Sequence, residues 1–211
     1  MSGLILKDLL VLRKQGKSYL LIIGIYMVLA FVGVFDYSIL STMMVVLTMM
    51  LPMATFSYDE LARWDKFAAA MPVGRSGIVK AKYLMALAVI GGAGLLCFEV
   101  NIIVAMIDHE AQLGALMASL GGSLGAGLLI NAAILPLLFK YGAEKSRSMM
   151  MVVMLAVFIL VFGLITIAGE GGFALTNAMT AVIPWLAALL VLGGFVVSYR
   201  ISQKLYAQKE L

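Results

Sequence analysis

The sequence predicts an all-α integral membrane protein with six transmembrane helices. Of its 211 residues, 64% are hydrophobic and only 12% are charged, whereas a soluble domain has roughly 25% charged residues. The mean hydropathy is +1.08. The apolar residues also lie in blocks of about 20, which is the length that a helix needs to cross a bilayer.

Six blocks have this length, and most of the charged residues lie between them. The predicted spans are Tyr19–Phe35, Ser38–Phe56, Tyr83–Ile107, Leu113–Phe139, Met149–Ala168 and Ala178–Tyr199. The chain is therefore divided into an N-terminal segment, a first transmembrane part, a charged segment, a second transmembrane part and a tail. These parts are residues 1–18, 19–56, 57–76, 77–199 and 200–211.

The basic residues all lie on one side of this topology. The 15 Lys and Arg residues precede the first span, follow the sixth, or lie between spans two and three or spans four and five. The opposite connections contain no Lys or Arg, only Asp36, Asp108, His109, Glu110 and Glu170. Because basic residues are enriched in cytoplasmic loops, both termini are predicted to be cytoplasmic. An odd number of spans would scatter the basic residues over both sides.

Several functional classes lack the residues that they need. The single cysteine, Cys97, cannot build a disulfide framework. His109 has an acid on each side, but three adjacent residues in a short loop make a poor metal cage. Gly16–Ser18 has the ending of a phosphate loop, but Val11 stands where that motif needs a glycine. We therefore expect no cofactor, no metal and no enzymatic activity in this chain. The net charge of +4 reports membrane orientation, so no nucleic-acid partner is expected.

The charged segment 57–76 has the pattern of a short amphipathic helix. Ser57 and Glu60 form an S-x-x-E capping box, which predicts a helix start. Pro72 ends the pattern, because proline cannot continue a helix interior. The segment is therefore predicted as a helix of about three turns.

This predicted helix has one apolar face and one charged face. Apolar residues recur at three- and four-residue spacing, and Asp59 and Arg63 are placed to pair at i,i+4. The apolar face consists of Leu61, Trp64, Phe67 or Ala68, and Met71, and the charged face of Asp59, Arg63 and Lys66. Such a helix can lie in the headgroup layer as a connector, or it can bind a cytoplasmic partner. The presence of both signs of charge favours a partner, because helices that only bind membranes are mostly basic.

A family resemblance bears on this choice. The motifs that carry it are Tyr58-Asp59-Glu60, Trp64-Asp65-Lys66-Phe67, Pro72-Val73-Gly74-Arg75 and Lys82-Tyr83. With these motifs, residues 57–84 resemble the first cytoplasmic loop of ABC-2-type transporter permeases. They are most similar to the compact branch that includes the permeases of phenol-soluble-modulin exporters. Residues 4–15 also resemble the opening of that family.

The resemblance implies a coupling helix in segment 57–76, which would sit in a groove of an ATP-binding subunit. The docking residues would be Asp59, Glu60, Arg63, Trp64, Asp65, Lys66 and Phe67. It also implies an interfacial elbow helix in the N-terminal segment. The pattern there suits an elbow, because Leu4, Ile5, Leu9 and Leu12 share a face opposite Lys7 and Lys14.

The resemblance further implies a permease subunit of an ABC exporter in a bacterial plasma membrane. Two copies would work with two ATPase subunits, which would bind ATP and Mg. By resemblance the cargo would be an amphipathic, membrane-active peptide. The 16 methionines are first of all apolar filler, but a flexible Met-rich wall would also accept such cargo.

Two polar residues inside the predicted spans are candidates for a transport pathway. Glu99 is an acid at membrane depth, where a charge is costly and is by default a functional hypothesis. It would contact cationic cargo, carry a proton, or close an interhelical hydrogen bond. Asn131 is the second candidate for a cargo contact. Glu99 also supports an alternative function, an ion-coupled secondary transporter, which is weakened by the lack of a recognisable inverted repeat.

Overall fold

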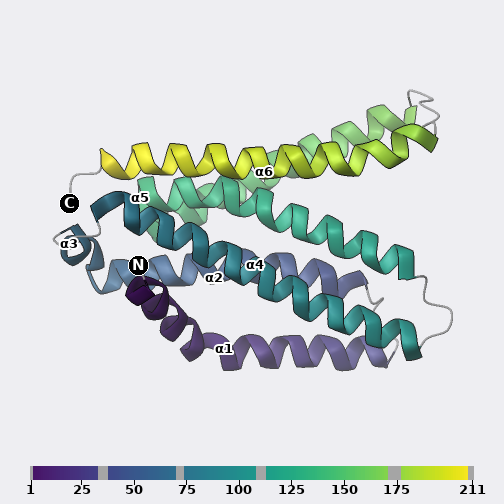
Figure 1. The fold of residues 1–211 in the computed structure, drawn as a ribbon, viewed down its shortest axis with the longest axis horizontal. Helices are drawn as coiled ribbons and strands as arrows, with labels where there is room; N and C mark the ends of the chain where they lie inside the picture. Colours follow the sequence, from purple (N-terminus) through teal and green to yellow (C-terminus); the bar gives the residue numbers. More distant parts are fainter. Residues whose placement is uncertain (1, 33–37, 70–73, 108–112, 171–176, 209–211) are drawn as a thin grey trace.

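The computed structural model describes residues 2–32, 38–69, 74–107, 113–170 and 177–208, and some side chains within these ranges fall outside the description. Every regular element in the described part of the chain is a helix (Figure 1). The helices are α1 (Ser2–Phe31), α2 (Ser38–Leu61), α3 (Trp64–Ala69), α4 (Gly74–Ile107), α5 (Leu113–Glu170) and α6 (Asn177–Ala207). Helices suit a membrane protein because they satisfy their backbone hydrogen bonds internally. The predicted all-α class is confirmed for these residues.

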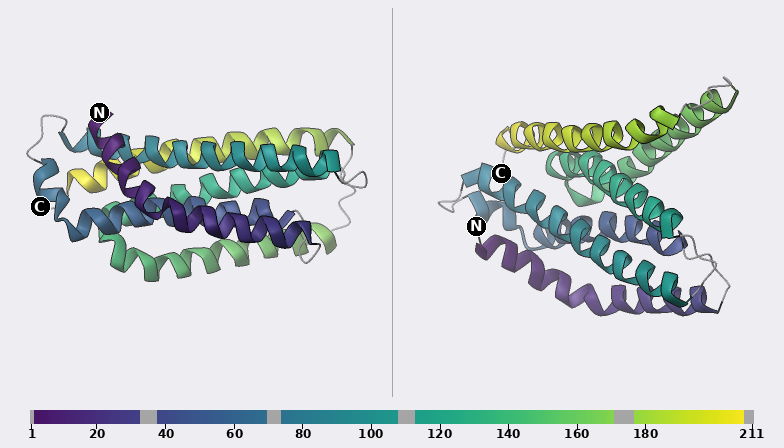
Figure 2. Two further views of the ribbon diagram at one scale, coloured as in Figure 1. Left: turned by 90° about the horizontal axis from the view of Figure 1, so that it is seen from below. Right: turned by 45° about the vertical axis from the view of Figure 1, so that its right-hand side comes forward.

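The 58-residue α5 consists of two helices joined at one glycine. Gly142 has φ 80° and ψ 179°, which is not helical. The first half of α5 runs to the end of the bundle where α3 lies, and the second half runs back (Figures 1 and 2). A loop was predicted between spans four and five, and the structure instead places a sharp reversal there. Glycine permits this positive φ, which costs other residues steric energy.

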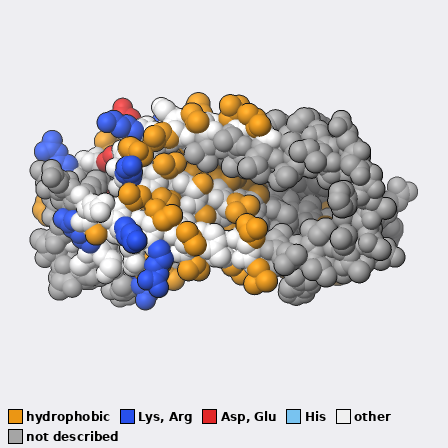
Figure 3. Space-filling model, turned by 90° about the horizontal axis from the view of Figure 1, so that it is seen from above, with side chains coloured by type: hydrophobic (Ala, Val, Ile, Leu, Met, Phe, Trp, Pro, Cys, Tyr) orange, Lys and Arg blue, Asp and Glu red, His pale blue; other side chains and the backbone are white. Residues whose placement is uncertain are grey.

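One end of the bundle collects the parts that were predicted to be cytoplasmic. The start of α1, the short α3, the break in α5 and the end of α6 all lie there (Figure 1). Lys and Arg side chains gather over the same end, and hydrophobic side chains cover the adjoining part of that face (Figure 3). We call it the charged end. The side of the membrane that it faces stays a prediction.

Three helical segments among the described residues are long and apolar enough to cross a membrane. They are Ser41–Leu61, Gly74–Ile103 and Gly114–Val152. The apolar part of α1, Lys17–Leu29, is shorter. Many side chains of the fifth and sixth predicted spans lie outside the description. Several membrane spans are therefore supported, and the count of six stays a prediction.

The buried core lies close to the charged end, where α2, α4, α5 and α6 meet. The Phe139 ring packs edge-on against Phe56, with centroids 4.9 Å apart, and against Tyr206 at 5.3 Å. Leu135 and Leu138 next to this ring are almost fully buried. The charged end therefore rests on well-packed side chains.

The first turns of α1 place an acidic residue against the bundle. Figure 1 shows that α1 changes direction along its length. Leu4 is buried against the bundle, whereas Leu6, Leu9 and Leu10 are exposed, with Leu9 at 58%. Asp8 takes the inward position instead and is only 2% exposed. The interfacial elbow helix stays a prediction, and the burial of Asp8 is an addition to it.

Candidate functional site

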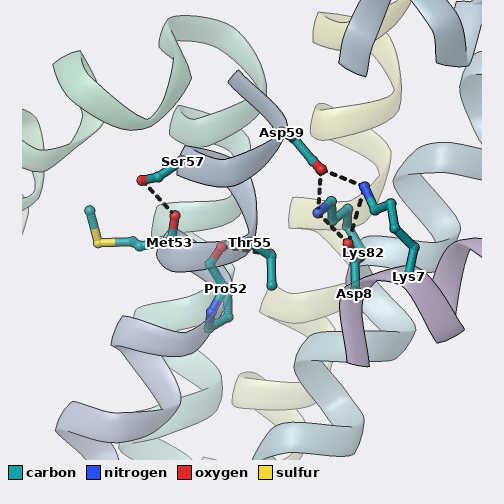
Figure 4. Close-up of polar contacts among 8 residues, drawn as sticks. All are labelled: Lys7, Asp8, Pro52, Met53, Thr55, Ser57, Asp59 and Lys82. Carbon is teal, nitrogen blue, oxygen red and sulfur yellow. Dashed lines mark hydrogen bonds and ion pairs between the residues drawn. The ribbon is translucent and has the colours of Figure 1, made fainter. Parts of the chain in front are cut away.

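The segment predicted as one amphipathic helix is divided between two elements. The helix α2 continues to Leu61, and the Ser57 hydroxyl donates to the Met53 carbonyl at 3.0 Å (Figure 4). This is the bond that a serine makes inside a helix, to the carbonyl one turn earlier. The capping box at Ser57 was therefore wrong, because the apolar helix before it simply continues.

A tight break separates α2 from α3. Arg63 has φ 48°, and its N–H donates to the Glu60 carbonyl at 3.0 Å. The following helix, α3, has only 6 residues in place of the predicted three turns. The predicted stop at Pro72 lies outside the described residues.

Asp59 lies at the centre of a four-residue ion cluster (Figure 4). Its carboxylate binds Lys7 of α1 and, at 2.6 Å, Lys82 of α4. Asp8 completes the cluster, with its Oδ1 3.0 Å from Lys82 Nζ and 3.3 Å from Lys7 Nζ. The predicted pairing of Asp59 with Arg63 was wrong, because Asp59 faces α1 and α4.

The ion cluster is largely shielded from water. The side chains of Asp8 and Lys82 are 2% and 7% exposed. Two acids balance two bases, so removal of one member leaves a buried charge without compensation. Lys7 also lies 4.4 Å from the centre of the Trp64 ring, which brings α3 into the same group. The cluster therefore connects α1, α2, α3 and α4.

Sequence reasoning missed Asp8 as part of this site. One signal was present, because Asp8 is the only acidic residue before Asp36. An acid on an otherwise apolar and basic helix needs a partner when it is buried. The sequence does not identify that partner.

Glu60 connects the same segment to the break in α5. Its Oε2 accepts a hydrogen bond from the Ala143 N–H at 2.9 Å. Ala143 begins the second half of α5, and a carboxylate is favourable at a helix N-terminus. A Cβ on Gly142 would clash with Glu60 Oε1. Glycine is thus needed at position 142 both for the positive φ and for space.

The seven predicted docking residues fall into different environments. Asp59 and Glu60 bond to other parts of the fold, and Trp64 is half-buried beneath Lys7. Arg63 is exposed, Phe67 is 65% exposed, and Leu61 at the end of α2 is 82% exposed. The side chains of Asp65 and Lys66 lie outside the description.

The two predicted pathway residues lie apart in the fold. Glu99 is exposed on the outer face of α4, as are Leu95 and Phe98. Asn131 is fully buried between α5 and α2, where its amide donates to the Thr48 carbonyl at 3.2 Å. The cargo roles proposed for both residues stay predictions.

A hollow of about 530 Å³ lies between α1, α2 and the second half of α5. We call it the methionine groove, because its lining includes Met49, Met50, Met53 and Met150. Arg147 lines it too, from the turn that follows the break in α5. Ligand sites have volumes of about 300–1,000 Å³ and mostly apolar linings with a few polar groups, so the groove has the size and character of one.

The fold and the site define a multi-pass helical membrane protein with an anchored, partly exposed short helix at its charged end. The chain belongs to the ABC-2 family of transporter proteins, because the model of the family "ABC-2 family transporter protein" matches residues 3–207. No curated protein and no solved structure matches the chain. The family confirms the resemblance to ABC-2 permeases at that level.

Membership of the family gives the chain its general role. It is the permease subunit of an ABC transporter, which works in a membrane with an ABC ATPase as its partner. Such permeases are the transport component and are generally not catalytic themselves. The alternative of an ion-coupled carrier based on Glu99 is not the class that the family indicates.

Proposed function

We propose that this chain is the permease subunit of a bacterial ABC exporter for amphipathic, membrane-active peptides. Two copies would work with two ATPase subunits that bind ATP and Mg, and the charged end would face the cytoplasm. The observation that carries the proposal is the exposed surface of Leu61, Arg63 and Phe67 at that end. We call it the docking surface.

The docking surface is better suited to a protein partner than to water. Leu61 and Phe67 are 82% and 65% exposed, and the charged Arg63 lies between them in the chain. Buried aromatic side chains and arginines carry most of the binding energy at protein interfaces. The surface begins at Leu61, where the apolar stretch of α2 ends, and continues into α3 at the charged end (Figure 1).

The segment that carries the docking surface, the end of α2 and α3, is connected to three other helices. Asp59 binds Lys82 of α4 and Lys7 of α1, and Glu60 binds the start of the second half of α5. Trp64 contacts Lys7 from α3. A movement of the partner against α3 would therefore act on α1, α2, α4 and α5 together. This is what a coupling helix must do.

The methionine groove supports peptide cargo. Methionine is flexible and polarizable, and Met-rich surfaces adapt to varied apolar ligands. Arg147 supplies one positive charge to a largely apolar wall that also includes Tyr19, Ser57 and Tyr58. An amphipathic peptide would place its apolar face on the methionines and its polar groups near Arg147.

Copurification of an ABC ATPase with the tagged chain tests the docking surface. In mild detergent the wild-type chain should recover the ATPase, and Phe67→Ala with Arg63→Glu should reduce recovery at least tenfold. Leu190→Ala is a matched control, because Leu190 is a 71% exposed apolar residue on α6. Full recovery by the double variant would refute the docking surface.

A further inference from the structure

The contacting helices α2 and α5 each contain a proline in their interior. Pro52 lies in α2 and Pro136 lies in α5. Proline has no N–H, so the carbonyl four residues earlier loses its helical hydrogen bond. The two carbonyls affected are those of Thr48 and Ala132. Inside a membrane no water replaces the lost bond, so another group of the protein must do so.

A side chain of α5 binds the free carbonyl of α2. Asn131 Nδ2 donates to the Thr48 carbonyl at 3.2 Å and to the Gly127 carbonyl at 2.8 Å. Carbonyl oxygens only accept hydrogen bonds, so the Asn131 amide donates both of its hydrogens to these two carbonyls. Its own Oδ1 has no hydrogen-bond partner among the described residues, although Asn131 is fully buried. The side chain is therefore oriented toward carbonyls, and one of them is the carbonyl that Pro52 frees.

Gly127 allows this close contact between α5 and α2. A Cβ at position 127 would lie 3.1 Å from Thr48 Oγ1. That distance is shorter than an ordinary carbon–oxygen contact, so a larger residue would push the helices apart. The Thr48 hydroxyl itself bonds within α2, to the Val45 carbonyl at 2.8 Å. Asn131 therefore supplies the donor for the Thr48 carbonyl.

The free carbonyl of α5 is bound in the same way by α6. Ser198 Oγ donates to the Ala132 carbonyl at 2.6 Å. Ser198 has only one hydroxyl hydrogen, so the Tyr83 hydroxyl 2.7 Å away must donate to Ser198. By the same count Ser202, also at 2.7 Å, donates to Tyr83. The hydrogen bonds thus run in one direction, from Ser202 through Tyr83 and Ser198 to α5.

The two proline breaks are linked because Asn131 and Ala132 are adjacent. The Asn131 side chain donates to the Thr48 carbonyl, which Pro52 leaves without its helical bond. The Ala132 carbonyl, which Pro136 leaves in the same state, accepts from Ser198 of α6. Tyr83 adds α4 to the same group. All three side chains that make these bonds, Asn131, Ser198 and Tyr83, are at most 5% exposed. Buried hydrogen bonds on the neighbouring residues Asn131 and Ala132 therefore connect the proline break in α2 to α6, and through Tyr83 to α4.

We propose that Asn131 and Ser198 are positioning residues for the coupling of ATP hydrolysis to transport. They hold α2 and α5 as linked hinges at Pro52 and Pro136, so that a displacement of the docking end of α2 bends both helices together. This rests on the proposed function, in which the ATPase moves that end. Sharp helix kinks occur characteristically at proline, so the bend is localised. Asn131 then has a role in motion rather than in cargo contact.

A double-mutant cycle on the full-length chain in detergent tests the hydrogen bonds. Pro52→Ala restores an N–H for the Thr48 carbonyl, so Asn131→Ala should matter less in that background. We expect the effect of Asn131→Ala on the unfolding equilibrium constant to be at least fivefold smaller with Pro52→Ala than without it. The pair Pro136→Ala and Ser198→Ala should behave in the same way.

Ser41→Ala with Pro52→Ala is the control, because Ser41 is another buried hydroxyl of α2, 3.4 Å from Ser119 of α5. Its effect should be additive with that of Pro52→Ala. If Asn131→Ala alone does not fold, recovery of folding in the double variant is the expected result. Additivity for Asn131→Ala, or no recovery, would overturn the assigned role.

Spin labels on the complex with the ATPase test the hinge. If Pro52 had a purely structural role, its substitution would not alter the change in label distance on trapping. Labels at Met106→Cys and Leu190→Cys, both more than 70% exposed, report α4 against α6 in a Cys97→Ser background. Trapping with ADP and vanadate should shift the distance between the labels in the wild type. Pro52→Ala should reduce this shift at least twofold while ATPase recovery is unchanged.

An equal shift in Pro52→Ala, or no shift in a wild-type complex, would overturn the hinge. Failure of the proposed function gives a different result. In that case the wild-type chain recovers no ATPase, whereas the double-mutant cycle still reports on the carbonyls.

Discussion

Asp8 is buried in a helix whose neighbouring residues are apolar or basic, and two lysines account for its position. Lys82 lies 3.0 Å from its carboxylate, and Lys7 lies 3.3 Å away. Buried charges are stable only when they are paired. The same reasoning applies to Asp59, whose carboxylate binds Lys7 and Lys82, while its docking role stays a prediction.

The cluster predicts that a single substitution lowers the free energy of unfolding much more than a double substitution that removes one charge of each sign. Asp8→Ala leaves Lys82 short of a partner and should destabilise the chain by about 3–5 kcal/mol. Asp8→Leu together with Lys82→Met removes one charge of each sign and should recover most of that loss. Denaturant unfolding in detergent measures both, with the exposed Arg13→Ala as a control on the same helix. Equal losses for the single and double variants would contradict the pairing.

Gly142 gives a second prediction for a single residue. Gly142→Ala places a side chain at φ 80° and against Glu60, so the free energy of unfolding should fall by about 1–3 kcal/mol. Gly193→Ala is the matched control, because a Cβ at Gly193 meets no atom and alanine favours a helix. If both substitutions have the same effect on thermal stability in detergent, the reversal does not depend on glycine.

At the scale of elements, a substitution in the break between α2 and α3 should change stability and ATPase binding in opposite directions. Arg63 adopts φ 48°, which glycine adopts more easily than any other residue. Arg63→Gly should therefore stabilise the chain by up to about 1 kcal/mol. It should also weaken recovery of the ATPase, because it removes the charge of the docking surface. A loss of stability together with full recovery would contradict the assignment of Arg63.

The helices themselves were predictable, but the geometry of the docking segment was not. Hydropathy located the apolar stretches because each depends only on local composition. The boundary at Ser57 was wrong because α2 continues through it. The partners of Asp59 and Glu60 could not be predicted, because they come from distant parts of the chain. Lys7 is 52 positions from Asp59, and Ala143 is 83 positions from Glu60. The hydrogen bond of Asn131 could not be predicted from the sequence either. Its acceptor, the Thr48 carbonyl, lies on another helix and lacks its helical bond because of Pro52.

At the scale of the whole molecule, the charged end joins the docking surface to the core and to the proline breaks. Glu99 belongs to none of these parts, because it lies on the outer face of α4. We therefore expect Glu99→Gln to leave ATP hydrolysis by the complex unchanged and to reduce cargo affinity at most. Vesicle ATPase assays check this. Loss of transport driven by a proton gradient in Glu99→Gln would instead indicate an ion-coupled carrier.

The most direct test of the account is uptake of a labelled amphipathic helical peptide into inverted membrane vesicles that contain the permease and its ATPase. The account predicts uptake that requires ATP, stops with vanadate, and is lost in Phe67→Ala with Arg63→Glu but retained in Leu190→Ala. Uptake driven by a proton gradient without ATP, or ATP-driven uptake that the double variant leaves intact, would contradict it.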